Sequence, residues 1–146
     1  MRLVNEQPET VLQKVGRKPD ADYGRDAQKY LTPTQVEALI KATGIDFRIG
    51  GNRAFYVPSA DYIQVPPPSS FFEPINLHRT VCHELGHWCG AGHRLNRDLS
   101  GNFGSPSYSR EELTAEMCAA FVCAALSIVP TVRHADYLAC WLDLLR

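Results

Sequence analysis

The sequence predicts a protein of the α+β class, in which a small, mostly antiparallel sheet packs against several helices. Short strand-like runs lie between residues 46 and 65, and glycine or proline residues bound them. From residue 73 onward, the apolar residues recur with helical spacing instead. Strands that are followed by helices, without regular alternation, are typical of α+β folds rather than of parallel α/β folds.

Length and composition indicate one domain. The chain has 146 residues, 45% apolar and 21% charged, which is ordinary for a soluble globular protein. We expect the polar residues 1–31 to be a flexible N-terminal arm or linker and residues 32–146 to form the domain. Fifteen basic and sixteen acidic residues leave a net charge of −1, so the basic excess of a nucleic-acid-binding protein is absent.

The cysteines and the apolar runs indicate a cytoplasmic protein. The five cysteines are odd in number and none stands in a CxxC pair, which favours reduced thiols. No apolar run approaches the roughly 18 to 20 residues that span a bilayer. The N-terminus has no signal-peptide core. We therefore expect a cytoplasmic location and no membrane partner.

Local signals place the individual elements. Thr32 and Gln35 form a capping box, which predicts a helix that ends at Gly44. Residues 46–49 and 54–57 flank a Gly-Gly-Asn turn, which is the signal of a β-hairpin. The remaining elements are expected to be a third strand over residues 62–65, helices over residues 73–89, 110–128 and 134–145, and a long loop over residues 90–108.

The segment from His83 to His87 reads HELGH and predicts a metal site. Residues four apart share one face of a helix, so both imidazoles can bind one ion from the same side. Neutral imidazole is a good zinc ligand, and we expect one Zn²⁺ per chain. Glu84 lies beside the first histidine and is the candidate catalytic base, which would take a proton from water activated by the metal.

Catalytic zinc sites usually have three protein ligands, and the sequence offers three candidates for the third. His93 would complete an HExxHxxGxxH pattern, with Gly90 allowing the turn. Glu112 and Glu116 share a face of the next helix and would make a gluzincin-like site. We favour Glu116, because a carboxylate among packed alanines needs a partner. Glu112 and His93 are the alternatives. Glu112 ranks below Glu116 because Ser109 and Glu112 have the spacing of a capping box, so Glu112 could simply cap the helix.

Four further residues are weaker candidates. His134 and Tyr108 could donate a hydrogen bond to an oxyanion or support a metal ligand, although a structural hydrogen bond is the simpler interpretation. Arg94 and Arg97 could bind a substrate carboxylate, but solvated loop charges are the simpler interpretation for both.

Several separate motifs carry a family resemblance. In order, they are GGNRAFY (50–56), DYIQVP (61–66), HELGHW (83–88), RLNR (94–97), FG (103–104), EELTAE (111–116), HADY (134–137) and WL (141–142). Together they resemble the zincin-like metallopeptidase domain of ArdC-type antirestriction proteins. The resemblance covers the chain from about residue 34 to residue 145.

The resemblance implies a zincin-like fold, with an active-site helix against a small sheet. It implies that His83 and His87 are metal ligands, that Glu84 is the base, and that the third ligand comes from the EELTAE segment. The family is carried by plasmids and other mobile elements and protects incoming DNA from restriction. Its members usually have an N-terminal single-stranded-DNA-binding domain, which this sequence lacks, so we expect any DNA association to depend on that missing domain.

These observations predict a zinc metallopeptidase that hydrolyses peptide bonds in a protein or peptide substrate. The alternative is a metal-stabilised, non-catalytic binding module that occludes a host protein or a DNA-processing partner. A secreted metalloprotease toxin built on HExxHxxGxxH is disfavoured by the cysteine pattern and by the missing export signal.

Overall fold

The computed structural model describes residues 35–126, 128, 139 and 142–143, and within them it confirms the α+β class. The predicted arm (1–31), the Thr32 cap, His134 and most of the predicted helix 134–145 lie outside the described residues. The elements are helix α3 (Gln35–Thr43), strands β1 (Asp46–Ile49), β2 (Phe55–Val57) and β3 (Tyr62–Val65), the short 3-10 helix η1 (Pro68–Ser70), and helices α4 (Pro74–Cys89) and α5 (Pro106–Ala125).

The three strands form a mixed sheet in the order β1-β3-β2. β3 pairs in parallel with β1 and antiparallel with β2, so the predicted hairpin between β1 and β2 is wrong. The segment between Ile49 and Phe55 is long enough to cross two strand spacings of about 4.8 Å each, which leaves a slot for the third strand. β3 fills that slot because Ile63 and Val65 are its most apolar positions, and both are fully buried there.

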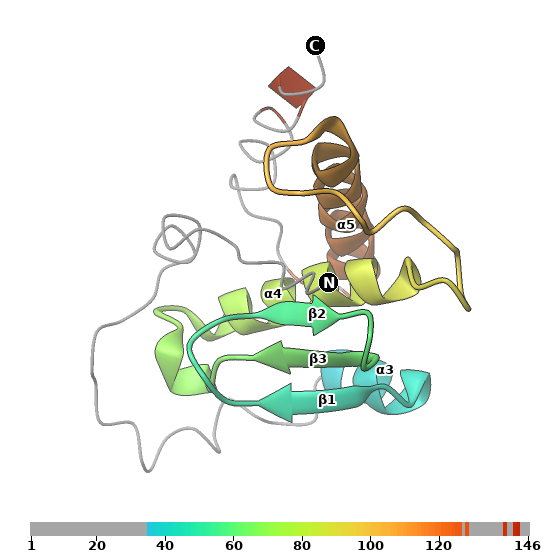
Figure 1. Ribbon diagram of the computed structural model, residues 1–146. Coiled ribbons are helices and arrows are strands. Elements are labelled where there is room, and N and C mark those ends of the chain that lie inside the picture. Colours follow the sequence, from blue (N-terminus) through green and yellow to red (C-terminus); the bar gives the residue numbers. More distant parts are fainter. Residues whose placement is uncertain (1–34, 127, 129–138, 140–141, 144–146) are drawn as a thin grey trace.

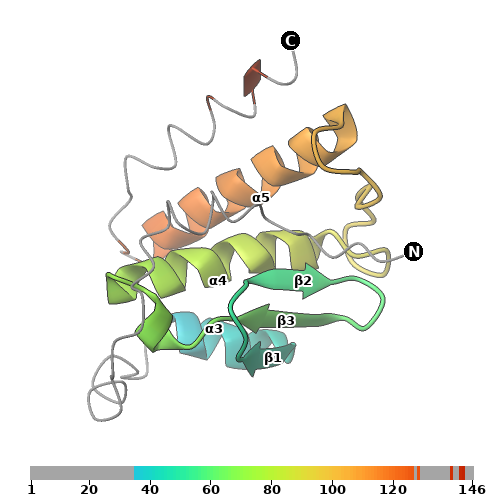
Figure 2. The same ribbon diagram turned by 60° about the vertical axis from the view of Figure 1, so that its left-hand side comes forward.

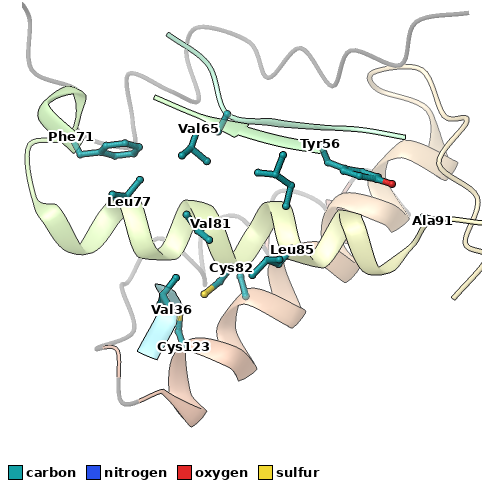
Figure 3. Close-up of a cluster of buried hydrophobic side chains, with 13 residues drawn as sticks. Val36, Tyr56, Val65, Phe71, Leu77, Val81, Cys82, Leu85, Ala91 and Cys123 are labelled. Atoms are coloured by element: carbon teal, nitrogen blue, oxygen red, sulfur yellow. The ribbon is translucent and has the colours of Figure 1, made fainter. Parts of the chain in front are cut away.

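Helix α4 lies between the sheet and α5, so it is covered on two sides (Figures 1 and 2). Leu77, Val81 and Leu85 recur every fourth residue and pack toward the sheet, where they meet Val65 and other core side chains (Figure 3). Burial of such side chains contributes roughly 25 cal/mol per Å² of apolar surface removed from water. The core therefore fixes the rotation of α4, and with it the direction of the face that carries the two histidines.

The second covered side of α4 faces α5 through small side chains. A Cβ atom built on Gly86 would lie 2.8 Å from the Cα atom of Ala115, which is closer than real side chains approach. Cys82 and Cys123, both fully buried, hydrogen bond to each other farther along the same contact. Because these residues are small, the two helix backbones approach closely, and longer side chains on either side of the contact can meet across it.

Helix α5 begins one turn earlier than the sequence predicted. Ser105 is the N-cap, its hydroxyl accepts a hydrogen bond from the Tyr108 backbone N–H at 3.2 Å, and Pro106 occupies the first turn. Ser109 is therefore inside the helix, where its hydroxyl donates to the Ser105 carbonyl at 3.0 Å. The capping box expected between Ser109 and Glu112 does not form, and the Glu112 side chain is left for another role.

The loop after α4 is fastened to the sheet by Arg94. Its guanidinium donates to both carboxylate oxygens of Asp61 and, at 3.1 Å, to the Tyr56 hydroxyl, and it stacks over the Trp88 ring at 3.9 Å. Arg94 is thus a structural residue rather than the solvated loop charge expected from the sequence. In the part of the chain that the structure describes, no helix combines the length and the apolar character that a membrane span requires.

We expect Gly86→Ala to destabilise the protein. Alanine is favoured over glycine in a helix by about 1 kcal/mol, but overpacking against backbone atoms costs typically 1–3 kcal/mol, and the backbone of Ala115 cannot rotate away. Thermal unfolding should show a Tm lower by about 3–6 °C. Gly92→Ala is the matched control, because its added Cβ would meet only the Asn96 side chain, at 3.7 Å, and its Tm should stay near that of wild type. An unchanged or raised Tm for Gly86→Ala would contradict the close contact.

Candidate metal centre

Two imidazoles from α4 and one carboxylate from α5 converge on one point. The Nε2 atoms of His83 and His87 are 3.1 Å apart. Glu112 lies opposite them, with Oε2 at 3.5 Å from Nε2 of His83 and Oε1 at 3.5 Å from Nε2 of His87. These three side chains form a group whose ligand atoms all lie within 4.8 Å of one another. Glu112 is almost completely buried, at 1% exposure.

The spacing of these atoms suits a divalent cation. Zinc–nitrogen and zinc–oxygen bonds of about 2.1 Å place neighbouring ligand atoms about 3.4 Å apart around a tetrahedron. The two Nε2 atoms are 3.1 Å apart, close to that value, and each lies 3.5 Å from a different oxygen of the Glu112 carboxylate. Two neutral imidazoles and one carboxylate are also the protein ligands of one class of catalytic zinc site. The donor set and its geometry therefore suit a divalent metal ion.

The outer ring nitrogens of both histidines bind carboxylates from the same helix, α5. Nδ1 of His83 lies 3.0 Å from Oε2 of Glu116, and Nδ1 of His87 lies 3.0 Å from Oε1 of Glu111. A carboxylate that accepts from Nδ1–H leaves the lone pair of Nε2 directed at the metal position. Glu116 thus supports His83 from behind, which favours Glu112 over Glu116 as the third ligand, the reverse of the order expected from the sequence.

The reason for that reversal lies in the start of α5. A helix that began near Ser109 would leave Glu112 in its first turn, as a capping residue. With Ser105 as the true N-cap, Glu112 lies in the second turn, on the face that packs against α4. Its carboxylate therefore reaches the two inner nitrogens, whereas Glu116, one turn later, reaches only the outer nitrogen of His83.

Glu84 is buried beside the same point. Its side chain is 2% exposed, and its Oε2 atom has no hydrogen-bond partner among the described residues. Burial raises the pKa of Glu84 above its ordinary value, although the two neighbouring histidines and a backbone hydrogen bond with Tyr56 of β2 act in the opposite direction. A buried oxygen without a partner is costly, and such atoms are typical of functional sites.

The electrostatics of the cluster favour positive charge at its centre. Burial alone would lower the pKa of His83, but Glu112 and then Glu116 raise it well above its ordinary value. Burial would likewise lower the pKa of His87, which Glu111 and Glu112 raise to about 9. Burial would raise the pKa of Glu112, yet the hydrogen bonds of both histidines hold it well below its usual range. A cation that displaced these protons would occupy the same favourable position.

The other predicted residues fall into two groups. Tyr108 lies beside the site, where its phenol hydrogen bonds with Glu112. Burial, followed by the neighbouring Glu112 and Glu84 carboxylates, raises the pKa of that phenol. His93 is not at the site: its side chain is 62% exposed and Nε2 lies 3.3 Å from Asp61, near the sheet. The HExxHxxGxxH pattern therefore does not make a three-histidine site.

Sequence reasoning placed neither Glu111 nor Arg97 at the metal centre. Arg97 donates to both oxygens of Glu111, at 2.8 and 2.7 Å, and Glu111 in turn binds His87. Arg97 is thus not the solvated loop charge expected from the sequence. The signal that could have revealed Glu111 was Ser105-Pro106, because the correct helix start turns both neighbouring glutamates toward α4.

The chain is similar to a known protein family and to named relatives. The model of a family described as zincin-like metallopeptidase matches residues 34–146. The protein y4eC of Sinorhizobium fredii is 44% identical over 114 residues, which are 77% of this chain and 37% of that protein. The DNA primase TraC of Escherichia coli is 38% identical over 124 residues, 84% of this chain and 12% of that protein. The chain therefore spans only a minor part of these relatives.

Two solved structures have a similar fold. The Mn(II)-bound crystal structure of the antirestriction ArdC protein from plasmid R388 matches with a TM-score of 0.64 and 33% identity, over 88% of this chain and 46% of that chain. The metal-free structure of the same protein matches with a TM-score of 0.63 and 34% identity, over 80% and 43% of the two chains. These matches confirm the zincin-like fold expected from the sequence.

Two of the three glutamates of α5, Glu112 and Glu116, should differ in their effect on metal binding. Glu112→Gln removes the charge of a candidate ligand, whereas Glu116→Gln changes only the partner of His83. We expect Glu116→Gln to weaken zinc binding by about 10- to 100-fold and Glu112→Gln to weaken it by more than that. Competition with a chromophoric chelator measures both affinities, and the two substitutions control for each other because they are chemically identical. A larger loss for Glu116→Gln would reverse the assignment.

Proposed function

The chain belongs to the zincin-like metallopeptidase family, and from this membership we propose that it is a zinc-dependent peptidase domain of the antirestriction type. The observation that carries the proposal is the convergence of His83, His87 and Glu112 on one point, with Glu84 buried beside it. Metal ligands without a neighbouring base would suit a purely structural site. The unpartnered Oε2 of Glu84 supports a catalytic one.

We propose zinc as the metal, bound once per chain. Two imidazoles and a carboxylate bind zinc more tightly than they bind manganese, according to the general order of divalent metal affinities. The R388 ArdC protein was crystallised with Mn(II), so manganese is the competitor that the relatives suggest. A divalent ion in this position would polarise the scissile carbonyl and make water more acidic.

The residues of the chain would then perform the proton transfers. Glu84 would accept the proton of the attacking water and give it to the leaving amine. This is general acid–base catalysis, for which a buried carboxylate with a raised pKa is suited. Its backbone hydrogen bond with Tyr56 would hold it in place. The phenol of Tyr108, which hydrogen bonds with Glu112, would turn to donate a hydrogen bond to the oxyanion that develops on the substrate.

The substrate is proposed to be an extended segment of a protein. β2 is an edge strand, and it adjoins α4 near Glu84. A peptide that added itself to the edge of β2 that pairs with no described strand would run past the base and the metal position. An unfolded or extended protein segment fits such an edge better than a compact one does.

The wider setting is proposed from the relatives. Relatives in this group include an antirestriction protein and a DNA primase, and this chain spans only part of each. We propose that the domain acts in the cytoplasm as part of a mobile element's defence against restriction. The near-zero net charge supports a protein substrate, with DNA association carried by a separate single-stranded-DNA-binding domain.

A metal-stabilised binding module is the second candidate. It is favoured by the way in which the ligands connect α4 to α5, because a metal there would stabilise the helix pair without any catalysis. Such a module would occlude a host protein or a DNA-processing partner rather than cleave it. The two candidates differ in whether the Glu84 carboxylate is needed.

The test is Glu84→Gln, with Glu73→Gln as the matched control. Glu73 precedes the same helix, is exposed, and makes no side-chain cap. Zinc content is measured by elemental analysis, and cleavage is measured by mass spectrometry on a library of unfolded proteins. We expect Glu84→Gln to keep its zinc and to lose cleavage by about 100- to 10,000-fold, while Glu73→Gln behaves as wild type.

Two results would contradict the peptidase proposal. The first is equal cleavage by wild type and Glu84→Gln, which would show that this base is not used. The second is a wild-type protein that binds zinc stoichiometrically and cleaves nothing in the library, which would favour the binding module.

A further inference from the structure

Arg97 is connected to the metal centre through a chain of short contacts. Its Nε and Nη2 atoms donate to the two oxygens of Glu111, at 2.8 and 2.7 Å. Oε1 of Glu111 lies 3.0 Å from Nδ1 of His87. Nη2 of Arg97 also donates to the carbonyl oxygen of Gly86, one residue before His87, at 2.6 Å. The guanidinium thus binds both the Glu111 carboxylate behind His87 and the backbone carbonyl of Gly86 beside it.

We propose that Arg97 is a positioning residue for the metal ligand His87, acting through Glu111. This inference rests on the proposed metal site. A bidentate arginine–carboxylate pair has a fixed planar geometry, unlike a pair made by lysine. The pair therefore sets both the place and the rotation of the Glu111 carboxylate. That carboxylate keeps the proton of His87 on Nδ1 and leaves Nε2 free to bind the cation.

Burial makes the arrangement effective. The side chains of His87, Glu111 and Arg97 are 3%, 10% and 22% exposed, so water competes little for their hydrogen bonds. The bidentate contact of Arg97 therefore fixes the position and rotation of the Glu111 carboxylate behind His87.

The loop is folded in a way that makes room for the guanidinium. A Cβ atom on Gly90 would lie 2.8 Å from Nη2 and 2.9 Å from Cζ of Arg97. Asn96 adopts a positive φ of 48°, and the Arg97 N–H donates to the Gly90 carbonyl at 2.9 Å. Two independent local features, a missing side chain and a left-handed backbone, thus bring this arginine against the end of α4.

The same loop supplies a matched control. Arg94 is also a largely buried arginine that donates to a carboxylate, but its partner is Asp61, near the sheet. Replacing either arginine by alanine removes one such pair and loosens the same loop. Only the loss of Arg97 should weaken zinc binding.

The experiment compares zinc dissociation constants of the full chain by chelator competition. We expect Arg97→Ala to weaken zinc binding by about 10- to 100-fold, Arg97→Lys to recover only part of that loss, and Arg94→Ala to stay within about threefold of wild type. Equal losses in Arg97→Ala and Arg94→Ala would reduce Arg97 to a structural residue and overturn the proposal. An unchanged affinity in Arg97→Ala would overturn it too.

A second set of variants covers the case in which Arg97→Ala does not fold. Glu111→Gln keeps the shape of the side chain and should lose zinc affinity to a similar extent. Arg97→Lys combined with Glu111→Gln should lose no more affinity than Glu111→Gln alone, because both changes break one connection. Additive losses would contradict action through Glu111. If the wild type binds zinc but cleaves nothing, only the peptidase proposal is contradicted. If the wild type cleaves normally and Arg97→Ala leaves the zinc affinity unchanged, only the role proposed for Arg97 is contradicted.

Discussion

The contact between α4 and α5 at Gly86 and Ala115 is the constraint on which the centre depends. Only small residues allow two helix backbones to come so close. At that separation, a glutamate side chain of α5 reaches across to an imidazole of α4. The three carboxylates of α5 that meet the histidines do so on either side of this contact, so a wider spacing of the helices would separate every pair together. The close packing of these two small residues thus determines how the histidines of α4 and the glutamates of α5 meet.

The centre consists of imidazole and carboxylate side chains, and burying any one of them without a partner would destabilise the fold. His87 and Glu112 are 2% and 1% exposed, and each would be destabilising without the other. A series of polar contacts runs from Arg97 to Glu111, from Glu111 to His87 and from His87 to Glu112. Each contact compensates for the desolvation of the two side chains that it joins. These contacts orient the side chains without a cation, and such preorganisation lowers the free-energy cost of binding one.

Much of this arrangement could be predicted from residues 83–87 alone. Spacing on a helix face is a local property, so the two histidines, the intervening glutamate and their orientation follow from the sequence. Which glutamate faces both inner nitrogens depends on where α5 begins, and Ser105-Pro106 and Ser109 offer competing capping signals one turn apart. The hairpin between β1 and β2 was wrong for a different reason. Strand order depends on which strand is buried best in the assembled core, and no local turn signal contains that information. The contact of Arg97 with Glu111 could not be predicted, because an arginine in a loop has no periodic pattern that shows which residue it meets.

All the ligands and their carboxylate partners come from two helices that are neighbours in the chain, whereas the backbone hydrogen bond to Glu84 comes from the sheet. Capture of an ion thus needs only the closure of one connecting segment, which is an entropically modest event. Orientation of the base needs the whole tertiary structure. The proposed ion binding and the proposed catalysis therefore depend on different parts of the fold. If both occur, a partly unfolded molecule that kept its helical pair would still bind the ion after it had lost its peptidase activity.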